Sequence, residues 1–137
     1  MNDREGYLHY LLDVAGAPHG ELPVRAAGRW DDILDLAEKN YILLPVAGML
    51  ASRWNDLLPE TVREDIRKLL EVNIARNTLL EHEIRFLAGL FGSAGIPAIF
   101  IKGSACLVRG MFPEGWRYLS DLDIQVPAGR LTEAFSL

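Results

Sequence analysis

The stretch between Pro59 and Gly95 constrains the fold most, because it has the pattern of one long helix. Proline suits the first turn of a helix, acidic residues follow where the helix dipole favours them, and Gly95 ends the run. Apolar residues recur along it at helical spacing and form one stripe. We expect either a single long helix or two helices with a kink near residues 73–77.

Shorter helices are predicted before this run. The first covers residues 3–14 and is followed by a Gly- and Pro-containing break. The second begins at Trp30, and the third covers residues 44–54. Residues 1–95 are therefore expected to form a helical region, in which Trp30 and Trp54 are packing residues.

The pattern changes after Gly95. Residues 96–101 are almost wholly apolar and rich in β-branched side chains, which predicts a strand buried on both faces. A helix is expected over 103–111, and the alternation over 122–126 predicts a second strand that Pro127 stops. The fold class is therefore α+β, with 96–137 as a partial sheet domain. Two strands alone are marginal, so the long helix or a second copy of the chain must cover them.

Two acidic residues, Asp121 and Asp123, stand at the start of the second predicted strand. Residues i and i+2 of a strand point to the same face, so both carboxylates are expected on one side of the sheet edge. Like charges held together need a cation or a shared proton to offset their repulsion. Mg²⁺ is the natural candidate, because it takes one or two carboxylates and fills its other positions with water and phosphate oxygens.

The first predicted strand is followed by Lys102, Gly103 and Ser104. Glycine lets a backbone approach a phosphate closely, and amides that open a helix can bind it. The two segments together indicate phosphate chemistry.

These segments resemble the nucleotidyltransferase superfamily that includes DNA polymerase β, whose signature is Gly-Gly or Gly-Ser, a gap, and Asp-hydrophobic-Asp. The chain is similar in particular to the bacterial family of uncharacterised nucleotidyltransferases. The matching residues are Ile96–Ser104, Phe112-Pro113, Arg117 and Ser120–Val126, with a looser helical similarity at Trp30, Leu44-Pro45 and Ala75–Asn77. The resemblance implies a helical region followed by the opening strand-helix-strand of a mixed sheet.

The resemblance also implies an activity and a set of site residues. Nucleoside monophosphate would pass from a nucleoside triphosphate to an unidentified acceptor hydroxyl, with up to two Mg²⁺ ions. Asp121 and Asp123 would be the catalytic and metal-binding residues. The nucleotide-binding residues would be Lys102, Gly103, Ser104, Arg117 and Ser120.

The chain departs from the superfamily pattern in two ways. The gap from Ser104 to Asp121 is long, and 112–115 is expected to form an extra loop. Members complete the metal site with a third carboxylate on a later strand, whereas Glu133, the last acid here, lies in a predicted helix. We therefore interpret the sequence as a fragment or a shortened relative, with activity of this chain alone left open.

Two other functions fit the same residues. A non-catalytic relative would bind nucleotide or another protein through an incomplete site. Alternatively, Asp-Leu-Asp is the metal motif of a sugar-nucleotide glycosyltransferase, although such motifs follow a substantial nucleotide-binding α/β region and here mostly helices precede it.

Several polar positions also have a plain structural interpretation. Asn73 and Asn77 lie on the apolar stripe of the long helix, where amides buried between helices are expected over substrate contacts. Cys106 is the single cysteine and is interpreted as a small core residue.

Composition limits the partners and the location. The net charge is −5, which disfavours a broad basic surface for duplex nucleic acid. No apolar run is long enough to span a bilayer, and the start of the chain lacks the features of a signal peptide. A cytoplasmic protein is expected, and exposed sheet edges would favour pairing into a homo-oligomer.

Overall fold

The computed structural model describes residues 29–137. The predicted helix over 3–14 lies outside the described residues. Contacts divide the chain into two compact units, and the boundary falls between Val72 and Asn73, inside the long helix. The unit that ends at Val72 is called unit 1 below, and Asn73–Leu137 is called unit 2.

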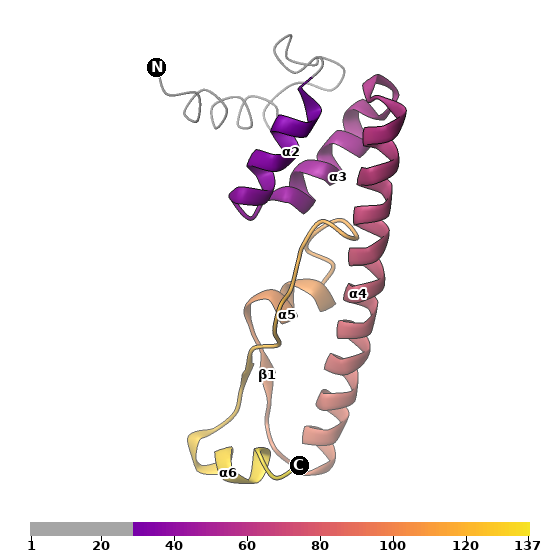
Figure 1. Ribbon diagram of the computed structural model, residues 1–137. Coiled ribbons are helices and arrows are strands. Elements are labelled where there is room, and N and C mark those ends of the chain that lie inside the picture. The colour runs from indigo at the N-terminus through magenta and orange to yellow at the C-terminus, as the bar shows by residue number, and fades with distance from the viewer. Residues whose placement is uncertain (1–28) are drawn as a thin grey trace. The chain divides into compact units, whose positions relative to one another are not determined.

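Unit 1 is built from helices that bury apolar faces. Helix α2 spans Trp30–Lys39 and helix α3 spans Leu43–Trp54; the two pack against each other (Figure 1). A short 3-10 helix, η1, follows at Asn55–Leu57. The buried apolar residues of this unit are Trp30, Ile33, Ala37, Leu44, Val46, Ala47, Met49, Leu50, Trp54, Leu58, Val62 and Ile66. Burial of Trp30 and Trp54 confirms that they are packing residues.

Helix α4 spans Glu60–Ser93 without interruption, so the single-helix alternative is confirmed. It ends as the sequence predicts: Gly95 has a φ of +64°, and the amide of Ile96 donates to the carbonyl of Phe91 at 2.9 Å. Glycine adopts this left-handed conformation without a Cβ penalty, and the returning bond satisfies a carbonyl at the helix end.

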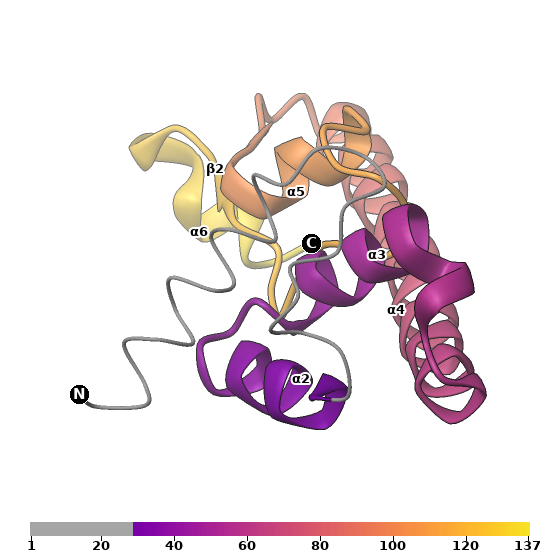
Figure 2. The ribbon, with the colours of Figure 1, turned by 90° about the horizontal axis from the view of Figure 1, so that it is seen from above.

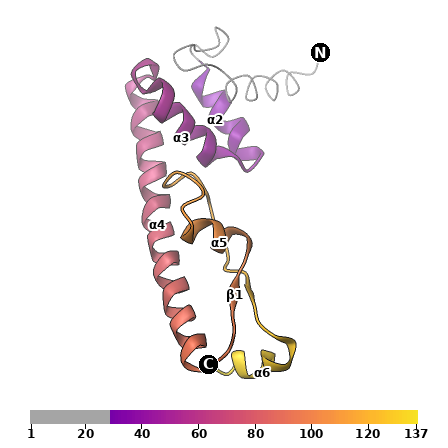
Figure 3. The same cartoon turned by 180° about the vertical axis from the view of Figure 1, so that it is seen from behind.

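Unit 2 adds a small sheet and short helices to the second half of α4. Strand β1 is Ile99–Phe100, helix α5 is Lys102–Val108, and strand β2 is Ile124–Gln125. The strands pair antiparallel, with Ile99 opposite Gln125. Figure 2 labels β2, and Figure 3 labels β1. The α+β class is confirmed, but each of these elements is shorter than predicted. The predicted burial of the first strand on both faces is wrong, since Ile99 is 61% exposed. Within residues 29–137, β1 pairs with β2 alone.

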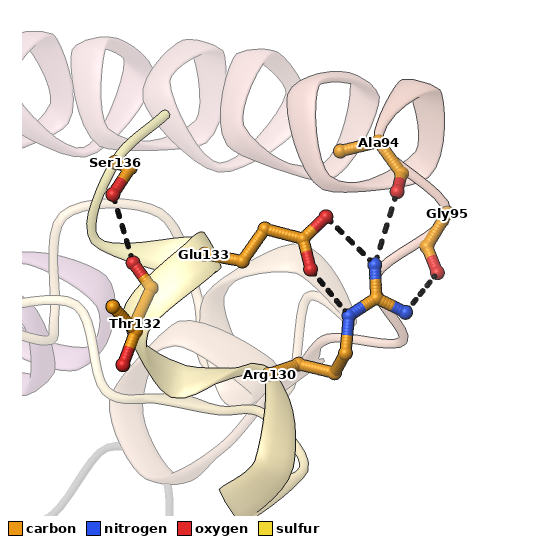
Figure 4. Close-up of polar contacts among 6 residues, drawn as sticks. All are labelled: Ala94, Gly95, Arg130, Thr132, Glu133 and Ser136. Carbon is orange, nitrogen blue, oxygen red and sulfur yellow. Dashed lines mark hydrogen bonds and ion pairs between the residues drawn. The ribbon is translucent and has the colours of Figure 1, made fainter.

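The chain ends in 3-10 helix η2, Ala128–Arg130, and helix α6, Leu131–Ala134. Glu133 therefore lies in a helix, as predicted. Arg130 donates to both carboxylate oxygens of Glu133, at 2.6 and 2.9 Å, and to the carbonyls of Ala94 and Gly95 (Figure 4). One guanidinium thus joins α6 to the carbonyls at the end of α4, which lack partners within the helix.

No helix in the described part of the chain combines the length and apolar character needed to cross a membrane.

Candidate functional site

Most of the residues predicted for the site gather around one hollow in unit 2. This hollow, of about 270 Å³, is lined by Lys102, Gly103, Arg117, Tyr118, Leu119, Ser120, Asp121 and Asp123. The structure therefore brings together every predicted site residue except Ser104. Its lining is mainly polar, and we call it the aspartate hollow.

Asp121 and Asp123 both precede strand β2, whereas the predicted strand over 122–126 included Asp123. The carbonyl of Asp123 accepts a hydrogen bond of 3.0 Å from the amide of Ile101, which extends the β1–β2 ladder. Ladder pairing thus fixes the backbone at Asp123. The Ser120 hydroxyl donates to Asp121 Oδ1 at 3.1 Å. The two acids therefore line the same hollow on a backbone held at one end by the sheet.

A cation already lies at this carboxylate pair. Lys102 Nζ is 2.9 Å from Asp123 Oδ1, and Lys102 has a φ of +52°, which is unusual for a residue with a side chain. The hydrogen bond to Asp123 raises the pKa of Lys102, and the charges of Asp123 and Asp121 add to this. The turn from β1 into α5 thus places an ammonium group against the acids.

Gly103 and Ser104 occupy different environments. A Cβ at Gly103 would lie 3.1 Å from Leu119 Cδ2, so the glycine lets the buried Leu119 side chain approach the backbone of α5. Ser104 is 1% exposed and does not line the hollow, and its hydroxyl has no hydrogen-bond partner among the described residues. Close packing against Leu119 therefore explains the glycine at position 103, and the Ser104 hydroxyl lies in the interior.

Helix α4 holds the loop that leads to the aspartates. Asn73 donates to the carbonyls of Gly115 and Arg117 at 2.8 and 2.9 Å, and Asn77 donates to that of Arg117 at 3.1 Å. Arg76 donates twice to the carbonyl of Leu119, at 3.0 and 2.8 Å. Helical spacing puts these three side chains on one face of α4. We call this set the carbonyl clamp.

The clamp corrects one expectation and adds residues that the sequence did not assign. Asn73 and Asn77 are buried, as predicted, but they bind loop carbonyls instead of another helix. Arg76 also lies over the ring of Tyr118, with 4.5 Å from Cζ to the centroid, and Tyr118 lines the hollow. The only signal for these roles was the position of Asn73, Arg76 and Asn77 beside the apolar stripe.

Arg117 is the second cation of the site. Its guanidinium lies over the Phe112 ring, with 5.1 Å from Cζ to the centroid, while its carbonyl is held by the clamp. Phe112 belongs to the loop predicted over 112–115, and the structure confirms a loop there. Arg117 thus lines the aspartate hollow from a segment anchored by its own backbone.

Within residues 29–137 there is no cluster of three or more His, Cys, Asp or Glu side chains arranged to hold a metal ion. Asp121 and Asp123 are the acidic residues that line the hollow. Their carboxylate oxygens are the ligand type that hard divalent cations prefer.

Two carboxylates, Asp121 and Asp123, thus lie around one hollow with the basic residues Lys102 and Arg117. A family model described as an uncharacterised nucleotidyltransferase matches residues 26–137, so the chain belongs to this nucleotidyltransferase family. Neither the curated proteins nor the solved structures contain a match to the chain.

Proposed function

We propose that the aspartate hollow binds a nucleoside triphosphate and transfers its nucleoside monophosphate to an acceptor hydroxyl. The observation that carries the proposal is the gathering of Asp121, Asp123, Lys102 and Arg117 around one hollow in a nucleotidyltransferase family member. The acceptor oxygen forms a bond to the α-phosphorus, and the bond to the bridging oxygen breaks. Pyrophosphate leaves with the electron pair, and the hydroxyl proton passes to water.

The carboxylate pair fits a divalent cation. Its donors are carboxylate oxygens, the hard ligands that Mg²⁺ prefers, and both acids line the same hollow. Asp121 and Asp123 would hold one or two Mg²⁺ ions, which when bound supply neutralisation of the triphosphate and a lowered pKa of the acceptor hydroxyl.

The other residues of the hollow act by charge and by orientation. Lys102 and Arg117 bind phosphate oxygens by charge-assisted hydrogen bonds, which strengthen as charge moves onto the departing pyrophosphate. Ser120 orients the Asp121 carboxylate through its 3.1 Å hydrogen bond. The carbonyl clamp keeps the segment that carries these groups in place.

The test is metal-dependent release of pyrophosphate by the purified chain with each nucleoside triphosphate and a panel of hydroxyl acceptors. Asp121→Asn and Asp123→Asn should each reduce the rate to background, because an amide loses the charge that holds the cation. Asp35→Asn changes an exposed aspartate of helix α2 and is the matched control. Undiminished turnover in either site variant would remove the catalytic assignment.

A non-catalytic nucleotide-binding role is the second candidate. It is favoured by the pairing of Asp123 with Lys102 and by the presence of only two acids in the lining of the aspartate hollow. In that case a triphosphate with Mg²⁺ raises the melting temperature through binding to the folded state but yields no pyrophosphate. Asp121→Asn would then reduce the shift in melting temperature.

A further inference from the structure

A second hollow lies within unit 2 between helices α4 and α5 and the loop after α5. It measures about 90 Å³. Its lining consists of Ile74, Asn77, Thr78, Glu81, Cys106, Leu107, Gly110, Phe112, Pro113, Glu114, Gly115, Arg117 and Leu119. We call it the α4–α5 pocket. It shares Arg117 and Leu119 with the aspartate hollow, so the two are neighbours along one loop.

One buried atom of this pocket lacks a partner. Asn77 is 7% exposed, and its Nδ2 donates to the carbonyl of Arg117, which fixes the orientation of the amide. Its Oδ1 accepts no hydrogen bond from the described residues. Leaving a buried acceptor unsatisfied is costly, so a ligand that donates a hydrogen bond there gains the corresponding free energy.

The charged lining favours a cationic donor. Glu81 and Glu114 line the pocket with a single basic residue, Arg117, whose guanidinium already lies over the Phe112 ring. Glu81 Oε2 also lies 3.8 Å from Nη2 of Arg85, in a long ion pair outside the lining. Thr78, the hydroxyl residue of the lining, donates to the carbonyl of Ile74. The pocket therefore offers acceptors and negative charge, which an ammonium group with three donors satisfies better than a neutral or anionic group.

We propose that the α4–α5 pocket binds the acceptor of the transfer reaction, and that this acceptor is a small molecule that carries, besides its reacting hydroxyl, a primary amine on an apolar body. The apolar body packs against Ile74, Leu107 and Phe112, and the ammonium group contacts Asn77 Oδ1 and Glu81. The acceptor role depends on the proposed nucleotidyl transfer, whereas the amine selectivity of the pocket does not.

Cys106 lines the pocket and is the single cysteine of the chain. The preference of the pocket for an amine can therefore be measured through mixed disulfides with Cys106. The protein is equilibrated with the disulfides of cysteamine, 2-mercaptoethanol or mercaptoacetate at a fixed thiol concentration. Intact-protein mass spectrometry then gives the fraction of each mixed disulfide. Cysteamine should be preferred over mercaptoacetate by about tenfold, the size expected for one hydrogen bond to a charged group.

Matched variants test whether the residues that line the pocket determine the preference for cysteamine. Asn77→Leu removes Oδ1 and should reduce the preference for cysteamine, whereas Asn40→Leu removes an exposed amide outside the pocket lining and should keep it. Glu81→Gln should lower the preference, and Glu83→Gln, an exposed neighbour on α4, should not.

Three outcomes would overturn the proposal: no preference among the three thiols, a Cys106 that reacts with none of them, or protection of Cys106 by adenosine or cytidine but not by benzylamine. The last would identify the pocket as a nucleobase site. None of these measurements uses a triphosphate. Amine selectivity with no pyrophosphate release would therefore count against the transfer reaction and leave the pocket intact.

Discussion

Unit 1 and unit 2 are stabilised by different kinds of contact. In unit 1 the described interior consists of apolar side chains from α2, α3 and the start of α4. In unit 2 the buried residues include Asn73, Asn77 and Ser104, and α4 reaches the loop through hydrogen bonds to carbonyls. Apolar packing is tolerant of rearrangement, whereas buried polar groups require specific partners.

This difference in contacts between the units coincides with the position of the two hollows. The aspartate hollow and the α4–α5 pocket both lie in unit 2, where α4 holds the loop that lines them by hydrogen bonds to its carbonyls. Among residues 29–137, unit 2 also exposes more of its large apolar side chains, among them Phe86, Ile99 and Phe135. The proposed site thus lies in the unit whose described interior depends more on polar contacts.

The largest effect is expected from truncating the interior of unit 1. Leu50 is 1% exposed, so Leu50→Ala should lower the free energy of unfolding by about 2–5 kcal/mol, through lost burial and the cavity left behind. Urea denaturation followed by tryptophan fluorescence measures it. Leu57→Ala is the control, because Leu57 is 56% exposed. Similar losses in both variants would show that burial of apolar side chains is not what stabilises unit 1.

An intermediate effect is expected when the clamp is made apolar. Asn73→Leu keeps the approximate size of the side chain but leaves the buried Gly115 carbonyl without its donor, which costs about 1–3 kcal/mol. Hydrogen exchange over residues 113–119 should accelerate. Asn40→Leu removes an exposed bond to the Leu36 carbonyl and should change stability by less than about 0.5 kcal/mol. Equal effects would show that unit 2 does not depend on its polar contacts.

Much of the helical part could be predicted from the sequence. The apolar stripe from Pro59, with Gly95 at its end, predicted α4 to within a few residues, because helical spacing and the glycine end signal are local properties. The strands were harder to predict. The apolar run over 96–101 predicted a fully buried strand, but burial of a strand depends on neighbouring layers, which local pattern does not encode.

At the candidate site, too, local features were predicted from the sequence and long-range contacts were not. The spacing of Asp121 and Asp123 and the Lys102-Gly103 turn were enough to predict residues that the structure places around one hollow. The close approach of Leu119 to Gly103 and the grip of Arg76 on the Leu119 carbonyl were not predicted, because they join residues far apart in sequence. Buried amides on a helix indicate a polar contact but not its partner.

The smallest effect on stability is expected from a change of pH. The comparison uses one ion pair from each unit. Lys68 lowers the pKa of Glu64 in unit 1, and the hydrogen bonds from Arg130 lower that of Glu133 in unit 2. A carboxyl whose pKa is lowered on folding contributes stability above its unfolded pKa, about 4.3, and loses it as pH falls through the folded pKa. Both pairs are exposed, so both contributions to the midpoint of urea unfolding should be small.

Their local consequences should nevertheless differ. Glu64 and Lys68 lie one turn apart on α4, whereas Arg130 also donates to the Ala94 and Gly95 carbonyls and thus joins α6 to the end of α4. Below about pH 4, hydrogen exchange should therefore accelerate over residues 131–136 more than over 60–71. Glu133→Gln should produce the same acceleration at pH 7, and it should add nothing in an Arg130→Gln background. Acceleration of both segments alike would mean that Arg130 does not fasten the end of unit 2.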